Sequence, residues 1–479
     1  MGGGQLKNDS DGYPSDGVFY AADAQKLQTF NDANRELSHL QAPALLHDAN
    51  PHERLYVACF DGTGNDKYQD PGHATNVAKI SDQLKALGNS KDSCIQPGYV
   101  PGPGTQNGAI ARTLDGITGH TYDQRTEEMY QQFITQAKQW RQDDPKADIR
   151  IAEIGFSRGA DQVPGFARLV EERGIQDPAG AKYTRDAHGQ ITHVDYTRPP
   201  LVPPGQTAQA VGLFDPVGTG DPVKYHDRRL PPSVISGFQI TAEDERRGLF
   251  KSDRIIKPGQ SPDGRFLAVN VAGAHSDIGG SYLLDGLAIR SDNLMIDYLN
   301  ALSDKPFLKK SAEPTDPSRN VIHRSEQSNF LYKFYPKINR NTPDGYNDLL
   351  VPKSQIGKVG DAYHAEPRNE LLSQHFERQF VKIGALPSQE HLSAAPTSHL
   401  SAQVDGLLAA GNSGDQAALR TGTQTLANSD AARAMQSEAE ATVNRQEHAQ
   451  ALLQSQAPLS AQEAAPPQQN PALSGPPQR

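Results

Sequence analysis

Cysteine is scarce in this chain: among 479 residues there are only two, Cys59 and Cys94. Two cysteines cannot form the disulfide framework of a small secreted domain, and neither has the cysteine and histidine neighbours of a zinc site. Cys59 lies within an apolar segment, and we interpret it as a core residue. The sequence therefore predicts no metal site, and nothing in it calls for another cofactor.

Long hydrophobic runs are also absent. No apolar segment approaches the roughly 20 residues that a helix needs to cross a bilayer. The first residues lack the basic stretch followed by an apolar stretch that marks a secretory signal. We therefore expect a protein made in the cytoplasm without a signal peptide, so that action elsewhere would need another route of export.

Positive charge does not dominate the chain. The 47 Lys and Arg residues are outnumbered by 57 Asp and Glu residues, which gives a net charge of −10 at pH 7. Binding to nucleic acid needs a basic face that neutralises phosphates, so nucleic acid is excluded as the main partner. The same balance provides no broad attraction to an anionic membrane, although a local basic patch stays open.

Aromatic residues are missing after Phe380. The composition beyond that point, rich in Ala, Gln and Ser, predicts a helical tail over residues 386–455 without large side chains to dock it. Proline and glutamine at the end predict disorder over residues 456–479. Two interpretations of this tail stay open, a solvated extension and a docking or export segment.

The rest of the chain alternates between strand and helix patterns. Strand patterns cover residues 53–60, 148–154, 208–214 and 266–272, and helix patterns cover residues 75–87, 122–141, 160–173 and 283–302. This alternation predicts an α/β fold with a mostly parallel sheet flanked by helices.

The predicted domain spans residues 51–385 and follows a polar N-terminal extension, residues 1–50, with one short helix near residues 21–40. Residues 176–205 are polar and proline-rich, and we interpret them as an insertion that forms surface or a lid. Residues 303–380 are interpreted as a second, globular insertion. The run of glycine and proline at residues 98–104 is predicted to be a loop.

Residues 155–159 read Gly-Phe-Ser-Arg-Gly and fit the G-x-S-x-G pattern of an α/β-hydrolase nucleophile elbow. By itself the pattern also fits an ordinary turn. The strand before it and the helix after it favour Ser157 as a nucleophile, because a serine in a strained strand-to-helix turn has an exposed hydroxyl. Pro164 costs on the order of 3 kcal/mol inside a helix and predicts a kink or a late start there.

Asp215 and His275 follow two further predicted strands, in the chain order Ser, Asp, His of α/β-hydrolases. Because the carboxyl ends of parallel strands meet at one edge of a sheet, we expect both to converge with Ser157. His275 would take and return the serine proton, and Asp215 would orient the imidazole. Alternatives stay open: Asp215 could merely start a turn before proline, His275 could be a packing residue, and Asp277 competes as the acid.

An oxyanion hole needs two N–H donors. We expect one from the backbone of Arg158, after the nucleophile, and the other from Gly62 or Thr63 in the turn that ends the first strand. That turn could also be a simple turn or a phosphate-binding nest. It lacks the Gly-Lys-Ser/Thr of a P-loop, which argues against nucleotide binding.

Several segments together resemble the α/β-hydrolase domain of the first family of bacterial type VI secretion lipase effectors. They are Phe-Asp-Gly-Thr-Gly-Asn at 60–65, Thr-Asn-Val at 75–77, the elbow at 155–160, Phe-Asp-Pro-Val-Gly at 214–218, Glu-Asp-Glu-Arg-Arg at 243–247 and Gly-Ala-His-Ser-Asp-Ile-Gly-Gly-Ser-Tyr at 273–282. The resemblance implies a triad of Ser157, Asp215 and His275 that hydrolyses acyl esters of phospholipids.

The resemblance also implies partners and a place of action. They are a phospholipid substrate at a membrane surface, a component of the secretion machine, an immunity protein that protects the producer, and a target cell whose periplasm or membrane face is attacked. Two other functions stay open on the residues alone: an esterase or thioesterase of soluble substrates, and a hydrolase-fold binding module without catalysis.

Overall fold

A computed structural model describes most of the first 387 residues, namely residues 17–68, 70–89, 93–102, 119–185, 191–218, 226–327 and 336–387. The predicted disordered end and the predicted helical tail from residue 388 onward lie outside these ranges.

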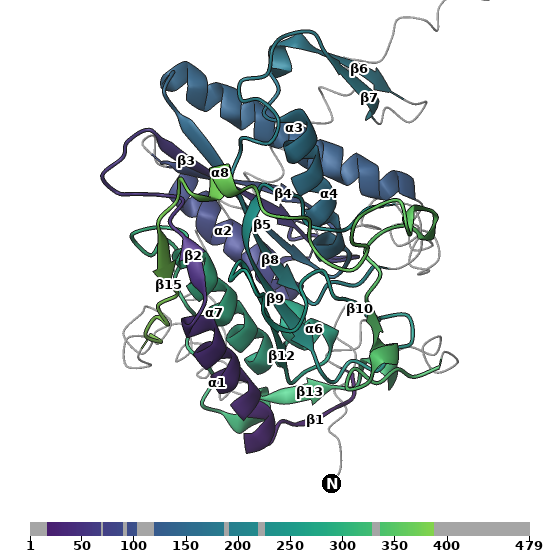
Figure 1. The fold of residues 1–479 in the computed structure, drawn as a ribbon. Coiled ribbons are helices and arrows are strands. Elements are labelled where there is room, and N and C mark those ends of the chain that lie inside the picture. The colour runs from purple at the N-terminus through teal and green to yellow at the C-terminus, as the bar shows by residue number, and fades with distance from the viewer. Residues whose placement is uncertain are drawn as a thin grey trace, which may run out of the picture. The chain divides into compact units, whose positions relative to one another are not determined.

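A seven-stranded sheet forms the centre of the fold (Figure 1). Its strands, in spatial order, are β11 (Gly259–Gln260), β12 (Phe266–Val271), β9 (Val234–Ala242), β8 (Gln209–Phe214), β5 (Asp148–Phe156), β3 (Glu53–Phe60) and β4 (Ile95–Val100). All neighbours are parallel except β11, which pairs with β12 in the antiparallel direction. The predicted α/β-hydrolase-like class, a mostly parallel sheet flanked by helices, is confirmed.

Strand β5 lies in the middle of the sheet and sets the register of the site. Phe156 at its end is opposite Phe214, the last residue of β8, and Gly155 is opposite Phe60, the last residue of β3. Parallel strands in register end at one edge. The residues that follow, among them Ser157 and Asp215, therefore emerge side by side.

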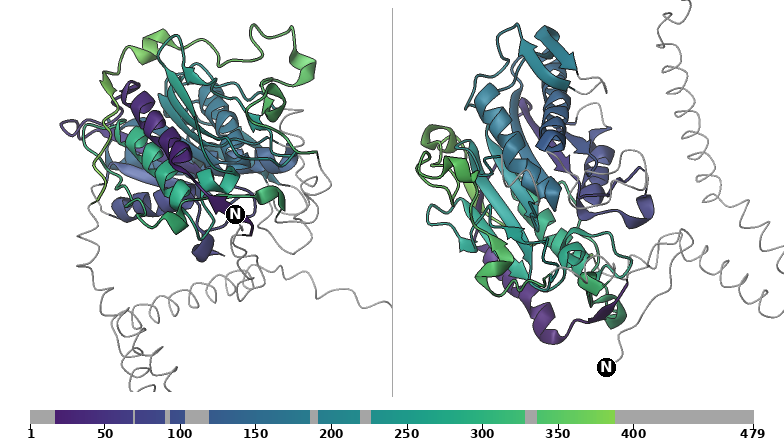
Figure 2. Two further views of the ribbon diagram at one scale, coloured as in Figure 1. Left: turned by 90° about the horizontal axis from the view of Figure 1, so that it is seen from below. Right: turned by 90° about the vertical axis from the view of Figure 1, so that its right-hand side faces the viewer.

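Helices cover both faces of the sheet (Figure 2). One face packs against α1 (Ala24–Ser38), α2 (Asn76–Gly88) and α7 (Gly286–Asn300), and the other packs against α3 (Gly119–Asp143) and α4 (Arg158–Arg173). Along β3, Val57 and Cys59 point into the first cluster and Ala58 and Phe60 into the second. This alternation follows from the two-residue period of a strand buried on both faces. Cys59 is a core residue, as predicted.

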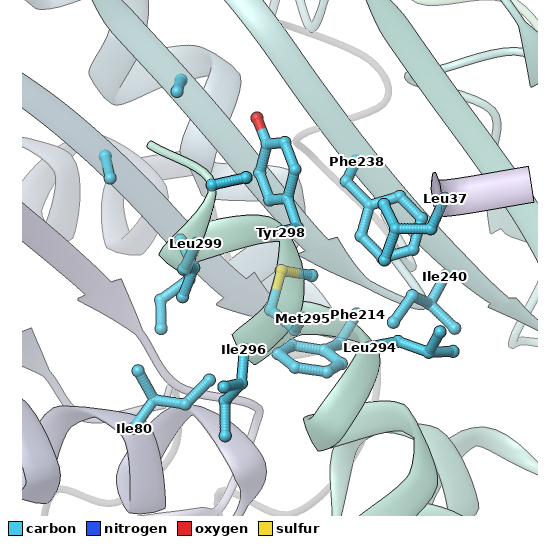
Figure 3. Packing of buried hydrophobic residues seen from close by; sticks show 14 of the residues in the cluster. Leu37, Ile80, Phe214, Phe238, Ile240, Leu294, Met295, Ile296, Tyr298 and Leu299 are labelled. Carbon is cyan, nitrogen blue, oxygen red and sulfur yellow. The ribbon is translucent and has the colours of Figure 1, made fainter. Parts of the chain in front are cut away.

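The N-terminal stretch belongs to this core. Phe30, Ala33 and Leu37 of α1 are at most 2% exposed and lie in the first cluster. Figure 3 shows Leu37 among side chains from α2, α7 and the sheet. Their spacing of three and four residues places all three on one face of the helix. The prediction of a polar extension over residues 1–50 is therefore wrong for residues 17–50.

Three pairs of short strands join segments that are far apart in the chain. β1 (Phe19–Ala21) pairs with β13 (Val321–His323), β2 (Gln41–Pro43) pairs with β15 (Arg378–Phe380), and β10 (Ser252–Asp253) pairs with β14 (Tyr346–Asn347). Two further α-helices are short, α6 (His275–Gly279) and α8 (Glu370–Ser373).

The first predicted insertion is an antiparallel hairpin of β6 (Ala181–Arg185) and β7 (Ile191–Tyr196). It follows the C-terminus of α4 and precedes β8, so it leaves the sheet at the amino ends of the strands. The hydroxyls of Tyr183 and Tyr196 contact Gln131 of α3 at 2.7 Å. Figure 1 shows the hairpin on the far side of α3 from α6. The described residues of this insertion form surface and do not cover Ser157.

Residues 98–104 were predicted to be a loop, but Gly98 to Val100 belong to β4. β4 is the last strand in the sheet order, where the proline at position 97 is tolerated because one side of the strand needs no partner. A Cβ on Gly98 would lie 2.0 Å from the Tyr56 hydroxyl oxygen, so glycine makes room for that ring. Strand β9, next to β8, was not predicted at all.

Helix α4 begins at Arg158 and continues through Pro164 to Arg173. The predicted late start is wrong, because the helix starts directly after Ser157. The Tyr122 hydroxyl donates to the carbonyl of Asp161 at 3.0 Å, which supplies a hydrogen bond in the turn before the proline. Packing on α3 and the sheet outweighs the local cost of proline.

Candidate active site

Ser157 occupies a strained turn between β5 and α4. Its φ of 59° and ψ of −124° lie in a region that residues other than glycine rarely adopt. Its N–H donates to Phe214 O at 3.1 Å, and its carbonyl accepts from Val217 N at 3.2 Å. These bonds tie the turn to the end of β8. The side chain is therefore presented at the carboxyl edge of the sheet, as an elbow requires.

His275 lies between Ser157 and Asp215. Its Nε2 is 2.7 Å from Ser157 Oγ, and its Nδ1 is 2.6 Å from Asp215 Oδ2. An ionised carboxylate can only accept a hydrogen bond, so Nδ1 holds the ring proton and Nε2 accepts from the serine hydroxyl. The structure thus brings together the three residues that the sequence placed at separate strand ends.

Asp277, the competing acid, bonds a different histidine. Its Oδ1 accepts from His323 Nδ1 at 2.5 Å, and its Oδ2 accepts from the backbone N–H groups of Ala274 and His323 at 2.8 and 3.0 Å. Asp277 therefore holds the start of α6 and ties it to β13. Asp215 is the carboxylate that faces His275.

Both oxygens of Asp215 accept hydrogen bonds. Oδ2 faces His275, while Oδ1 accepts from the Ala242 N–H at 3.1 Å and from the guanidinium of Arg340. Burial raises the pKa of Asp215, but Arg340 and His275 outweigh burial and lower it to about 2. The carboxylate is therefore ionised at neutral pH.

His275 is packed between two aromatic rings. Its ring centroid lies 4.6 Å from that of Phe156 and 5.1 Å from that of Phe250. Its backbone N–H donates to Glu245 Oε2 at 3.2 Å. Burial lowers the pKa of His275 more than the hydrogen bond to Asp215 raises it. The resting imidazole is therefore neutral and available as a base.

Glu245 is the centre of a second charged pair beside His275. Arg247 donates to it through Nε at 3.0 Å and Nη2 at 2.8 Å, and its guanidinium lies 3.4 Å from the centroid of the Phe250 ring. Burial opposes ionisation of Glu245, but Arg247 lowers its pKa to about 2. The pair fixes both the backbone and one aromatic wall of His275.

We expect kcat/KM for hydrolysis to fall with decreasing pH only below pH 6.5. His275 must be neutral to accept a proton, and its pKa lies below the ordinary 6.5 because burial disfavours the charged ring. Below that pKa the rate should fall about tenfold per pH unit as the base is lost. The measurement is kcat/KM against pH on a soluble ester, and a midpoint above 6.5 would contradict this expectation.

The turn after β3 uses one of the two predicted oxyanion donors for itself. The Gly62 N–H donates to Asp61 Oδ1 at 2.7 Å. Asp61 also accepts from the Thr75 and Tyr99 hydroxyls at 2.7 and 2.5 Å. Burial raises its pKa to about 6, although the bonds from Tyr99 and Thr75 oppose this. Asp61 therefore engages the Gly62 N–H in this structure, which favours Thr63 within the pair, and the donation of the second oxyanion hydrogen bond by Gly62 or Thr63 stays a prediction.

The same turn lies against the elbow. A Cβ on Gly159 would lie 2.3 Å from Phe60 O, and a Cβ on Gly62 would lie 2.6 Å from the Phe156 ring. Glycine at position 159 lets the start of α4 approach the backbone at the end of β3, and glycine at position 62 makes room for the Phe156 ring. Arg158, the first residue of α4, follows Ser157 directly, and Thr63 Oγ1 is a buried atom without a hydrogen-bond partner among the described residues.

Three residues of the site were missed in the sequence. Glu245 and Arg247 lie in segment 243–247, which supports the family resemblance, but the residues alone indicated no role for them. Arg340 lies in a turn of the predicted second insertion. No motif surrounds it, so no signal in the sequence linked it to Asp215.

Within the described residues, no three His, Cys, Asp or Glu side chains are grouped so that they could hold a metal ion. No helix there combines the length and the apolar composition needed to cross a membrane.

Residues 54–306 match the model of a protein family described as "T6SS, Phospholipase effector Tle1-like, catalytic domain". The match covers more than half of the chain and includes Ser157, Asp215 and His275. The chain belongs to this family. The resemblance inferred from the motif segments is thereby confirmed. No curated protein matches the chain.

Three solved structures are similar to the Tle1-like chain. An uncharacterized protein from Pseudomonas aeruginosa is 17% identical, covers 66% of this chain and 54% of its own, and has a TM-score of 0.34. A Tle1 effector bound to the VgrG spike of the type 6 secretion system is 23% identical, covers 50% and 52%, and has a TM-score of 0.28. An acetyl xylan esterase is 12% identical, covers 53% and 96%, and has a TM-score of 0.22. The chain spans about half the length of the first two.

Proposed function

We propose that this Tle1-like chain is a serine esterase that cleaves acyl esters of phospholipids. The observation that supports it most is the continuous line of hydrogen bonds from Ser157 Oγ through His275 to Asp215, 2.7 and 2.6 Å long. A serine hydroxyl is a weak nucleophile alone, and a neutral imidazole at this distance activates it. Family membership supports the substrate class.

In the first half of the reaction, Ser157 Oγ attacks the acyl carbonyl carbon while its proton moves to His275 Nε2. The tetrahedral intermediate collapses, the bond to the leaving alcohol breaks, and His275 gives the proton to that oxygen. In the second half, water gives a proton to His275 and attacks the acyl-serine. The ester bond to Ser157 breaks, the hydroxyl is restored, and a fatty acid leaves.

Charge develops at two places during these steps. Asp215 is ionised and stabilises the imidazolium of His275, which forms in each half-reaction. The negative carbonyl oxygen is stabilised by backbone N–H groups, for which we propose Arg158 at the start of α4 and Thr63 in the adjacent turn. The steps together consume one ester and one water, release an alcohol and a fatty acid, and restore Ser157 and neutral His275. They need neither a metal nor an added cofactor.

The family description also supports a route of delivery. We propose that the protein acts as an antibacterial effector, associates with a component of the type VI secretion machine, and is released at the periplasm or membrane face of a target cell. An enzyme that degrades phospholipids endangers its producer, so we further propose an immunity protein as a partner. The helical and disordered tail, residues 386–455 and 456–479, stays a prediction.

The test is the set of products released from a defined phospholipid labelled differently in its two acyl chains. We expect a free fatty acid and a lysophospholipid, with a rate that rises when the lipid forms micelles. Cleavage of soluble esters or thioesters without any phospholipid turnover would instead indicate an enzyme of soluble substrates. Failure of a fluorophosphonate to label Ser157 would indicate a binding module without catalysis.

A further inference from the structure

A fully buried arginine, Arg340, bonds the carboxylate of Asp215 and was not among the predicted site residues. Arg340 Nη1 donates to Asp215 Oδ1 and, at 3.1 Å, to the carbonyl of Ala242, while Nη2 donates to the carbonyl of Phe250 at 2.7 Å. The side chains of Arg340 and Asp215 are both 0% exposed. One guanidinium therefore links the acid, the end of β9 and the segment that places Phe250 beside His275.

We propose that Arg340 is a positioning residue for ester hydrolysis, which keeps Asp215 ionised and turned toward His275. This inference rests on the proposed function of Ser157, His275 and Asp215. Arg340 is not expected to touch the substrate, and it acts through the carboxylate.

The physical reason lies in how the two oxygens of Asp215 divide their partners. Oδ2 faces His275 Nδ1, and Oδ1 has the Arg340 guanidinium and the Ala242 N–H. Without Arg340, a buried carboxylate would keep only one neutral donor on Oδ1, and a buried charge without a cation tends to take up a proton. A protonated Asp215 would donate to Nδ1, which moves the ring proton to Nε2. That tautomer cannot accept the hydrogen of Ser157.

The segment around Arg340 is itself held in place. Tyr346 donates to the Arg340 carbonyl at 2.6 Å, and a Cβ on Gly345 would lie 2.8 Å from the Arg340 Cα. On the other side, Arg246 donates to Asn339 Oδ1 at 2.8 Å, and its carbonyl accepts from Ile338 N at 3.0 Å. The guanidinium is therefore delivered by a segment fixed on both sides. This segment belongs to the predicted insertion of residues 303–380, so this part of the insertion contacts the site through Arg340.

The charges that face His275 make the effect measurable. Asp215 and Glu245 favour the protonated ring, and Arg247 disfavours it. Glu245 is paired with Arg247, whereas the cation on the far side of Asp215 is Arg340. Removing Arg340 leaves the charge of Asp215 uncompensated. Protonation of the Asp215–His275 pair then becomes easier. The pH at which the rate falls on the acid side of the pH–rate profile, called the acid limb below, should therefore be higher.

The experiment compares Arg340→Met, Arg340→Gln and Arg340→Lys with the wild type. For each, kcat/KM on a soluble ester and the rate of fluorophosphonate labelling of Ser157 are measured against pH. We expect Arg340→Met to lower kcat on the order of 10²-fold and to move the acid limb up by about one pH unit. Arg340→Lys retains the charge and should leave the limb within about 0.3 units.

Arg319→Met is the matched control, because Arg319 belongs to the same insertion but pairs with Asp285 and does not touch Asp215 or the Arg340 segment. It should retain kcat within about twofold. A second control places Arg340→Met in an Asp215→Asn background. If Arg340 acts through the acid, its loss there should change kcat by less than about twofold, because the two effects are not additive.

The inference is overturned if Arg340→Met leaves the acid limb in place, or if it lowers kcat equally in both backgrounds. If a thermal melt shows that Arg340→Met does not fold, Arg340→Gln replaces it, because glutamine keeps a hydrogen-bond donor and removes the charge. The criterion is again whether the acid limb of the pH–rate profile moves to higher pH. If wild-type Ser157 does not react with the fluorophosphonate, the proposed function fails. If it reacts and the limb does not move, only the role of Arg340 fails.

Discussion

Replacing Ser157 by alanine is expected to lower kcat for ester hydrolysis by about 10⁶-fold. The change removes the attacking oxygen and leaves His275 and Asp215 without a nucleophile to serve. The strained backbone at position 157, with its φ of 59°, is the same for alanine as for serine. The fold should therefore persist, with a melting temperature within about 3 °C of the wild type.

The measurement is initial rate on phospholipid micelles, together with a thermal melt of each preparation. Ser276→Ala is the control, since Ser276 is the neighbour of His275 in α6 and loses the same hydroxyl. It should stay within about twofold of the wild type. Turnover by Ser157→Ala above one tenth of the wild-type rate would rule out Ser157 as the nucleophile.

Asp215→Asn is expected to lower kcat by about 10⁴-fold with little change in geometry. The amide keeps the size of the carboxylate but loses its charge, and its NH₂ can donate to His275 Nδ1. The ring proton then moves to Nε2, which faces Ser157 Oγ at 2.7 Å and can no longer accept from it. The imidazolium formed during the reaction also loses its counter-charge.

Asp277→Asn is the matched comparison, because Asp277 lies close to His275 in the sequence and, like Asp215, bonds a histidine. Its partner is His323, at 2.5 Å. We expect a lower melting temperature, because α6 is less firmly held, and a fall in kcat of less than about tenfold. If Asp277→Asn were the more damaging of the two, Asp277 rather than Asp215 would be the acid of the triad.

Much of the fold could be predicted from the sequence, because it depends on local patterns. Strand 53–60 was predicted with the bounds that β3 has, and helix 75–87 is within one residue of α2 at each end. Buried parallel strands are continuous apolar runs, and Thr75 caps α2 by accepting from the Ala78 N–H. Such signals lie within one element and need no information about its neighbours.

The wrong predictions concern elements whose place depends on contacts with residues distant in sequence. Helix α1 was assigned to a polar extension, although Leu37 and Phe30 complete the core under the sheet. The glycine at position 98 marked a loop, although it lies in an edge strand beside the Tyr56 hydroxyl. In each case the deciding contact comes from a residue distant in sequence, and composition near the element pointed the other way.

The motifs along the chain were enough to indicate the family and to point to Ser157, Asp215 and His275 as candidate residues of the site. A serine in an elbow, followed by an aspartate and a histidine at later strand ends, is a local pattern in a fixed chain order, and parallel strands bring such ends to one edge. Only the tertiary contacts show which groups bond the side chains of the site. In the structure, Asp277 bonds His323, the Gly62 amide bonds Asp61, and Arg340 bonds Asp215. These pairings join segments far apart in the chain or depend on a single backbone torsion, and hydrogen-bond geometry on that scale has no signature in a linear sequence.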